Sequence, residues 1–246
     1  MIIKGLQKLT LLDYPGHLAC TVFTGGCNFR CPFCHNASIV LGEGSENYSE
    51  EEIFGFLEKR KGRLDGVAIT GGEPLLQKDI ADFMRHIKSL GYKIKLDTNG
   101  SFPEKLKELI NEGLCDYVAV DIKNAPNKYS ETVGRLGYFP ERVAESVDFL
   151  MNCGIEYEFR TTVVAELHMA EDIEEIGKWI KGAKRWYLQS FVDSGDLISS
   201  DMHGLSTKIM NQYIEIARNT YQVLNFVVYN YTTTIYSCLC HNLHKM

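Results

Sequence analysis

The chain alternates between two hydrophobic periods along most of its length, and this alternation limits the folds that it can adopt. Apolar residues at spacings of three and four predict helices between short apolar segments that are typical of strands. Strands that alternate with helices run parallel and are joined by right-handed crossovers. The six expected strands cover residues 18–23, 66–70, 92–97, 117–122, 155–164 and 185–191. We therefore expect an α/β fold, either an open barrel of six βα units or a doubly wound sheet.

Local signals support individual elements. Ser49 and Glu52 have the spacing of a capping box at the start of a helix that runs to about Lys59. Strand 92–97 alternates apolar and polar residues and places Lys95 on its polar face.

The chain shows no linker and no break in composition, so we expect a single domain over residues 1–230. A seventh strand is expected at 223–229. The C-terminal tail at 231–246 has no assigned role.

Composition excludes several classes of partner. The 246 residues carry a formal net charge of −6, whereas general nucleic-acid binders usually have a basic surplus. No segment approaches the ~20 apolar residues of a membrane-spanning helix, and the N-terminal residues lack the features of a signal peptide. We expect a cytoplasmic protein with no nucleic-acid or membrane partner. In that compartment disulfides are rare, and cysteines more often bind metal or react.

Three of the eight cysteines, Cys27, Cys31 and Cys34, lie close together in a long segment without clear periodicity. Thiolates at this density need a metal or a cluster to hold them. An ordinary iron–sulfur site takes four cysteines, and the sequence has no fourth cysteine nearby, so one iron would remain open to a non-protein ligand. The alternative is a structural zinc site completed by His35, because zinc accepts three cysteines and one histidine. The tight spacing favours the cluster.

The segment 23–36, FTGGCNFRCPFCHN, resembles the CxxxCxxC signature of the radical S-adenosylmethionine (SAM) superfamily, including the aromatic Phe33 before the last cysteine. The Phe-x-x-Gly before the cysteines and the His-Asn after them resemble the glycyl-radical-enzyme activases. Segments 5–8 and 12–16 are similar to the start of the anaerobic ribonucleoside-triphosphate reductase activating proteins. The resemblance extends over about residues 5–197.

This resemblance implies a partial (β/α)6 barrel with parallel strands. It implies one [4Fe–4S] cluster on Cys27, Cys31 and Cys34 and a site for SAM, with Phe33 and His35 among the cofactor-binding residues. Reductive cleavage of SAM would give a 5′-deoxyadenosyl radical, which takes a Cα hydrogen from a glycine of a partner enzyme. The cofactors carry this chemistry, and the protein supplies ligation, orientation and exclusion of water. A flavodoxin or a ferredoxin is the expected electron donor.

Polar motifs follow the expected strands, where the loops of a βα barrel build the active site. Gly71, Gly72 and Glu73 follow the second strand. The glycines allow close backbone approach to a ligand, and by the resemblance Glu73 binds the amino group of SAM. The alternative is a Gly-Gly turn with a solvated glutamate. Asp97 and Asn99 follow the third strand and can bond ribose hydroxyls or polar groups of methionine, the alternative being a capping turn.

The later strands end in weaker candidates. By the resemblance, Asp121 and Lys123 face SAM, with the lysine meeting a carboxylate; the alternative is a surface ion pair. Arg160 is another candidate carboxylate partner, and Val164 is a candidate wall near adenine. The residues that could close the site after the sixth strand are Gln189, Ser190 and Phe191.

The remaining cysteines have no expected role in the site. Cys20, Cys115 and Cys153 lie in or beside elements and are expected to be small buried hydrophobes. The CLCH segment at 238–241 could bind metal but lacks a matching pair of ligands elsewhere.

Activation of anaerobic ribonucleoside-triphosphate reductase is therefore the expected function. Within the superfamily the alternatives are a pyruvate formate-lyase-type activase and a small-molecule radical SAM enzyme. A zinc-stabilised binding module without catalysis is the alternative from a different class.

Overall fold

The computed structural model describes residues 1–42 and 47–221, which fall into two compact units. Unit 1 consists of Met1–Arg30, Asn36–Asp121 and Pro140–Tyr157, and unit 2 of Cys31–His35, Ile122–Phe139 and the described residues from Glu158 onward. The single domain over residues 1–230 stays a prediction. The strand expected at 223–229, the tail and the CLCH segment lie outside the described residues.

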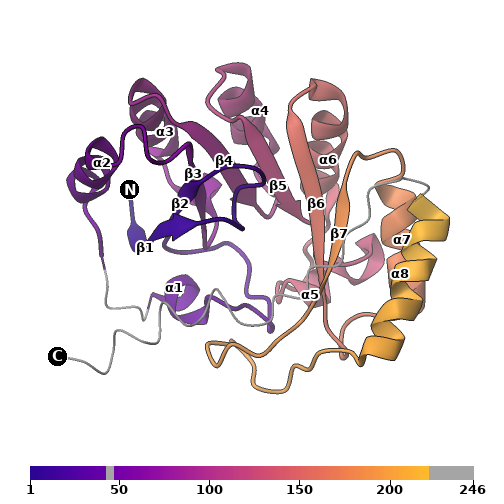
Figure 1. Ribbon diagram of the computed structural model, residues 1–246. Coiled ribbons are helices and arrows are strands. Elements are labelled where there is room, and N and C mark those ends of the chain that lie inside the picture. The colour runs from indigo at the N-terminus through magenta and orange to yellow at the C-terminus, as the bar shows by residue number, and fades with distance from the viewer. Residues whose placement is uncertain (43–46, 222–246) are drawn as a thin grey trace. The chain divides into compact units, whose positions relative to one another are not determined.

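Unit 1 contains five strands that lie side by side in chain order (Figure 1). The strands from β2 to β5 are parallel to their neighbours, whereas β1 runs antiparallel to β2. Their bounds are β1 Ile3–Thr10, β2 Ala19–Thr24, β3 Gly66–Gly71, β4 Lys93–Thr98 and β5 Tyr117–Asp121.

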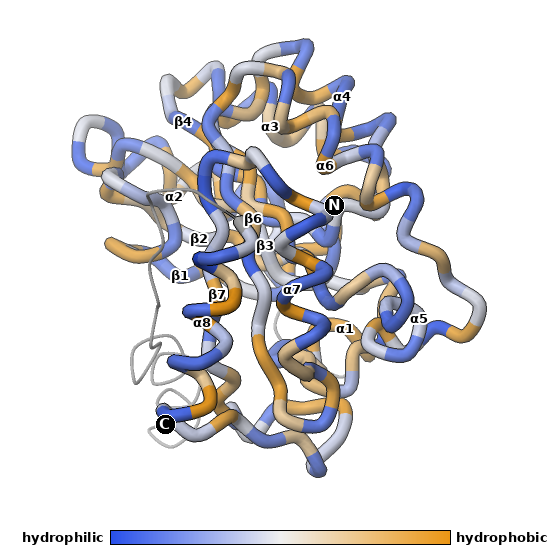
Figure 2. Tube along the Cα trace, turned by 90° about the vertical axis from the view of Figure 1, so that its right-hand side faces the viewer, coloured by the Kyte–Doolittle hydropathy of each residue, from blue (hydrophilic) through white to orange (hydrophobic). Residues whose placement is uncertain are grey.

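Helices of unit 1 cover these strands with their apolar faces. Ile80, Phe83, Met84 and Ile87 are buried on α3, and Figure 2 shows apolar and polar residues alternating along α3 and α4. The central residues of β3, from Val67 to Ile69, are fully buried, as expected of a parallel strand covered on both faces. The helices are α1 Ala37–Leu41, α2 Glu50–Lys59, α3 Ile80–Ser89, α4 Pro103–Asn111 and α6 Glu141–Cys153, with a 3₁₀ turn, η1, at Pro74–Leu76.

Unit 2 pairs β6 with β7 in parallel, from Phe159 opposite Trp186 to Val163 opposite Ser190. Helices α7 and α8 lie side by side (Figure 1). The bounds are η2 Pro126–Lys128, α5 Tyr129–Thr132, β6 Glu156–Val163, α7 Ala170–Trp179, β7 Trp186–Ser190 and α8 Thr207–Tyr221, and the first two residues of β6 belong to unit 1.

Each of the six expected strands forms within one residue of its predicted ends. The antiparallel strand β1 was not predicted, and it departs from the expected all-parallel arrangement. Lys4, Gln7 and Lys8 are partly buried or exposed on this outer strand. Because these positions tolerate polar residues, the sequence of β1 lacks a clear period-two pattern. The described part of the chain contains no helix with the length and apolar composition needed to cross a membrane.

The expected capping box at the start of α2 is confirmed. The Ser49 hydroxyl accepts a hydrogen bond from the Glu52 N–H at 3.2 Å, and the Ser49 N–H donates to the Glu52 carboxylate at 2.8 Å. Two backbone donors that the first turn would leave unpaired are thereby satisfied.

We expect Ser49→Ala to lower the free energy of unfolding by about 1 kcal/mol, because it removes the oxygen that caps α2. Ser49→Thr keeps that oxygen and is the matched control. Urea denaturation of the three chains measures the effect, and equal losses in both variants would contradict the capping role.

Candidate functional site

The candidate residues of unit 1 follow the carboxyl ends of neighbouring parallel strands. Cys27 comes after β2, Glu73 after β3 and Asn99 after β4. Because β2, β3 and β4 pair in parallel, these three loops begin at the same edge of the sheet.

Gly71 and Gly72 let two backbones meet. A Cβ on Gly72 would lie 1.9 Å from the carbonyl oxygen of Gly26, and one on Gly71 would lie 2.4 Å from the backbone nitrogen of Thr24. Gly71 also has a φ of +110°, which side chains disfavour. The Gly72 N–H donates to Thr24 O and the Glu73 N–H to Gly26 O, both at 2.8 Å. The glycines are therefore required for packing against the segment that leads into Cys27. Their contact with a ligand stays a prediction.

Glu73 is fully buried, so the alternative of a solvated glutamate is wrong. Its Oε1 accepts from the Leu75 N–H at 3.0 Å and from the Thr98 hydroxyl at 2.7 Å, and its Oε2 accepts from the Asn99 N–H at 2.7 Å. Burial raises the pKa of the Glu73 carboxyl to about 7, although these hydrogen bonds act in the opposite direction. The carboxyl group joins the loop after β3 to the loop after β4, and its pairing with the amino group of SAM stays a prediction.

Asn99 connects this network to Cys27. Its side-chain Nδ2 lies 3.8 Å from the Cys27 Sγ and donates to Asn28 Oδ1 at 2.9 Å. The Cys27 Sγ also accepts from the Phe29 N–H at 3.3 Å. The same Sγ lies 3.9 Å from Asn28 Oδ1.

Asn28 and Ser101 extend the same network, and the sequence did not single them out. The Asn28 amide donates to the Ser101 hydroxyl at 2.9 Å, and that hydroxyl donates to Asn99 Oδ1 at 2.6 Å. Asn28 lies inside the cysteine motif and Ser101 lies two residues after Asn99, and these sequence positions could have identified them as site residues.

Asp97 is ion-paired with Lys95, which lies two residues earlier on β4. The Lys95 side chain is almost completely buried, and its Nζ lies 5.9 Å from the centre of the Tyr117 ring. Lys95 on the polar face of β4 is therefore an interior residue, which strand alternation alone did not show. A contact of Asp97 with ribose stays a prediction.

In unit 2, the segment Cys31–His35 carries two aromatic contacts. Phe33 is buried, and the Lys123 Nζ lies 5.9 Å from the centre of its ring. The His35 ring stacks on Phe191, with 5.1 Å between ring centres and 18° between ring planes. Phe191, which was expected to close the site, thus packs beside one candidate cofactor residue, and Lys123 packs beside another.

Arg160 lies within β6 and Val164 directly after it, both in unit 2. The Ile122 N–H donates to Arg160 O at 2.8 Å, which fixes the start of the segment carrying Lys123 against this strand. An Arg160 Nη1 lies 3.9 Å from Glu158 Oε1, so a protein carboxylate already lies beside this guanidinium. Val164 is fully buried.

The remaining candidates divide between the units. Cys27 and Asp121 belong to unit 1, whereas Cys31 and Cys34 belong to unit 2 and are joined by a hydrogen bond from the Cys34 N–H to Cys31 O at 3.0 Å. Joint ligation of one cluster by the three cysteines therefore stays a prediction. Gln189 Oε1 accepts from the Thr162 hydroxyl at 3.5 Å.

Comparison with known families and proteins adds independent findings. A family profile described as "Radical SAM superfamily" matches residues 21–180, a range that contains the cysteine motif and the candidate site residues up to Val164. A protein of Methanocaldococcus jannaschii named as a glycyl-radical enzyme activating enzyme is 33% identical over 231 residues, which are 92% of this chain and 95% of the relative. A pyruvate formate-lyase-activating enzyme of Clostridium pasteurianum is 27% identical over 74% of this chain and 77% of its own length.

Solved structures show the same fold. A radical SAM methyltransferase from Sphaerobacter thermophilus superposes with a TM-score of 0.70 at 17% identity, over 90% of this chain and 68% of that chain. A domain of a pyruvate formate-lyase-activating enzyme from Bacteroides vulgatus superposes with a TM-score of 0.54 at 17% identity, over 67% of this chain and 99% of that chain. These likenesses confirm the expected fold class, an α/β fold of the radical SAM type with a partial (β/α)6 barrel.

We expect Gly72→Ala to lower the free energy of unfolding by about 3 kcal/mol or more, because the new Cβ can be accommodated only if backbone moves. Gly55→Ala is the matched control: no atom lies within 4 Å of its added Cβ inside α2, and it should raise stability by up to about 1 kcal/mol. Thermal and urea denaturation measure both. Normal stability of the Gly72 variant would contradict the packing described here.

The raised pKa of Glu73 predicts a pH dependence of stability. A carboxyl with a pKa of about 7 in the folded chain and 4.5 when unfolded stabilises the fold fully below pH 4.5 and loses this contribution as pH rises through 7. Relative to Glu73→Gln, the wild-type free energy of unfolding should therefore fall by about 2.5 kcal/mol between pH 5 and pH 8. Glutamine does not titrate, so Glu73→Gln changes the hydrogen bonding by the same energy at every pH. If urea titrations show that the free energies of unfolding of the two chains differ by the same amount at every pH, they contradict the raised pKa.

Proposed function

The chain belongs to the radical SAM superfamily, and we propose that it generates a glycyl radical on a partner enzyme, the anaerobic ribonucleoside-triphosphate reductase. The observation that carries the activase part of the proposal is the 33% identity to a protein named as a glycyl-radical enzyme activating enzyme, over 95% of that relative's length. The choice of reductase rests on the motif resemblance at residues 5–8 and 12–16.

The donor chemistry of this chain fits an iron–sulfur cluster and SAM. Cys27, Cys31 and Cys34 would hold a [4Fe–4S] cluster and leave one iron open. The Cys27 Sγ accepts a hydrogen bond from the Phe29 N–H at 3.3 Å and lies 3.8 Å from the Asn99 Nδ2. When bound, the cluster and SAM supply a 5′-deoxyadenosyl radical able to take a hydrogen from the partner's glycine.

The chain's own residues bind and orient SAM in this proposal. Lys123 and Arg160 are cations that would meet a carboxylate, and Asp97 and Asp121 are acceptors that would meet hydroxyl or ammonium groups. The residues that would complete the cofactor site are Phe33, His35, Gly71, Gly72, Glu73, Asn99 and Val164. We further propose a cytoplasmic location and a flavodoxin or ferredoxin as the source of the electron.

A pyruvate formate-lyase-type activase is the second candidate. It is favoured by the relative from Clostridium pasteurianum, which matches 74% of this chain. Membership of the radical SAM superfamily argues against the zinc-stabilised module without catalysis.

Anaerobic reconstitution tests the cluster. The wild-type chain should take up about four irons and form 5′-deoxyadenosine from SAM under dithionite, whereas Cys31→Ala should form none. Cys153→Ala is the matched control, since that cysteine lies at the end of α6 and contacts Leu150 O. Unchanged turnover in the Cys31 variant would overturn the ligand assignment.

The partner is tested in the same preparation. Incubation of the reduced chain and SAM with each candidate glycyl radical enzyme should give a glycyl EPR doublet with the ribonucleotide reductase. A doublet with pyruvate formate-lyase alone would replace the first candidate by the second.

A further inference from the structure

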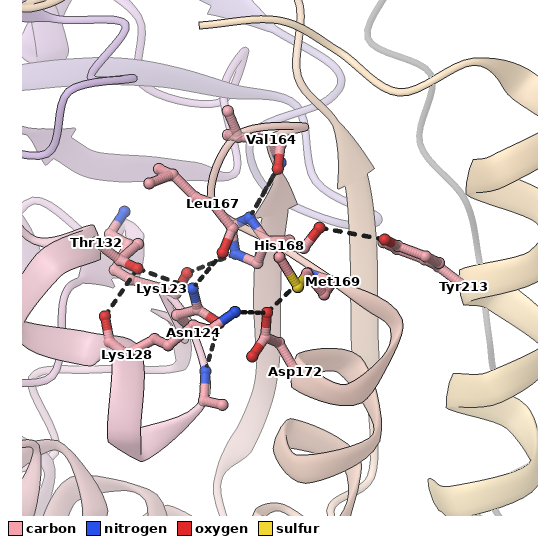
Figure 3. Close-up of polar contacts among 11 residues, drawn as sticks. Lys123, Asn124, Lys128, Thr132, Val164, Leu167, His168, Met169, Asp172 and Tyr213 are labelled. Atoms are coloured by element: carbon pink, nitrogen blue, oxygen red, sulfur yellow. Dashed lines mark hydrogen bonds and ion pairs between the residues drawn. The ribbon is translucent and has the colours of Figure 1, made fainter.

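In unit 2, three side-chain contacts join the segment after β5 to the segment after β6 (Figure 3). His168 contacts the backbone carbonyl of Lys123, with 2.9 Å from its Nε2. The Asn124 amide donates to Leu167 O at 3.0 Å. The Lys128 Nζ pairs with Asp172 Oδ2 at 2.7 Å. Of these residues, Lys123 alone was a candidate site residue from the sequence.

The geometry defines the protonation of the His168 ring. A carbonyl oxygen only accepts, so Nε2 carries the hydrogen that faces Lys123 O. Nδ1 lies 3.1 Å from the Val164 N and 3.3 Å from Val164 O. Because a neutral ring carries one hydrogen and Nε2 holds it, Nδ1 accepts from the Val164 N–H. The ring is 2% exposed, and burial lowers its pKa, which agrees with a neutral ring at pH 7. One neutral imidazole therefore bridges the backbone of Lys123 and the backbone of Val164.

Lys123 and Val164 are ligand candidates of unit 2 that follow the ends of β5 and β6. Lys123 presents its ammonium group over the Phe33 ring, and Val164 begins the turn that leads to His168 itself, through hydrogen bonds from the Leu167 and His168 N–H groups to Val164 O. A shift of the ring would therefore move a candidate carboxylate-binding residue and a candidate adenine-contact residue together.

We propose that His168 is a positioning residue for SAM, whose neutral ring holds Lys123 and Val164 at the spacing that SAM requires. This inference rests on the proposed function and deepens it. His168 does not touch the ligand in this scheme but acts through the two residues that it bridges.

The surrounding contacts are expected to keep unit 2 folded when His168 is replaced. Asn124 is fully buried, with its amide donating to Thr132 Oγ1 at 2.8 Å as well as to Leu167 O, and its Oδ1 accepting from the Ala125 N–H at 2.7 Å. The two segments thus stay joined without the imidazole. Polar groups that are all paired in this way form a rigid scaffold.

Three variants separate the two contacts of the ring. His168→Gln can still donate to Lys123 O, His168→Asn can still accept from the Val164 N–H, and His168→Leu does neither. Tyr213→Phe is the control, because the Tyr213 hydroxyl donates to His168 O at 3.2 Å on the side of α8 and touches neither Lys123 nor Val164.

The first measurement needs no cluster. Long-range ¹H–¹⁵N NMR of the histidine-labelled chain should show His168 as the Nε2–H tautomer, and hydrogen exchange of the Val164 amide should accelerate in His168→Leu but not in His168→Asn. The opposite tautomer, or unchanged exchange in His168→Leu, would overturn the bridge.

The second measurement is the affinity of the reconstituted chain for SAM, by calorimetry. His168→Leu should bind SAM about tenfold more weakly, the factor expected for about 1.4 kcal/mol, with smaller losses in the glutamine and asparagine variants and none in Tyr213→Phe. If His168→Leu binds SAM with wild-type affinity, the role proposed for His168 is overturned and the proposed function is not. A wild-type chain that binds no SAM would overturn the proposed function and this role with it.

Discussion

The direct packing of backbone on backbone between the loops after β2 and β3 is the constraint on which the site in unit 1 depends. No side chain fits at Gly72, where a Cβ would overlap the carbonyl of Gly26. The two hydrogen bonds across this contact fix the segment just before Cys27. The segment before Cys27 has no helical or strand periodicity of its own, so its position depends on these contacts with the loop after β3. The start of the loop that carries Cys27 is therefore held rigidly against the sheet.

Buried polar side chains perform the same task in both units. Glu73 joins two strand-end loops in unit 1, and His168 and Asn124 join two in unit 2. Such groups are costly to bury unless each donor and acceptor is paired. The contacts of Glu73 and Asn124 meet this condition, so both side chains select one arrangement of their loops. An apolar side chain could fill the same space but could not hold a particular carbonyl or amide in place.

The sequence predicted the regular elements well and the contacts of the site residues poorly. Strands β2 to β7 were predicted because continuous or alternating apolar residues report burial directly. Strand β1 was missed because partial exposure weakens its alternating pattern, and Lys95 was placed on a polar face although it is buried. Gly72 was predicted to approach a ligand, which stays a prediction, and the sequence did not show that packing against Gly26 also requires a glycine there. Local pattern does not show which distant segment packs against a residue. For the same reason His168 carried no signal, since its partner Lys123 lies 45 residues away.

Asn99 shows why the residues of unit 1 act as a group. Its backbone N–H donates to Glu73, while its side chain reaches the Cys27 Sγ and Asn28. Glu73 in turn is held by the turn at Leu75 and the hydroxyl of Thr98. A change in any of these contacts alters the placement or the charge of its neighbours, so the effects of single substitutions will not add. The protonation of the buried carboxyl after β3 and the environment of the cysteine sulfur after β2 are therefore coupled through one asparagine, and neither can be assigned an energy independent of the other.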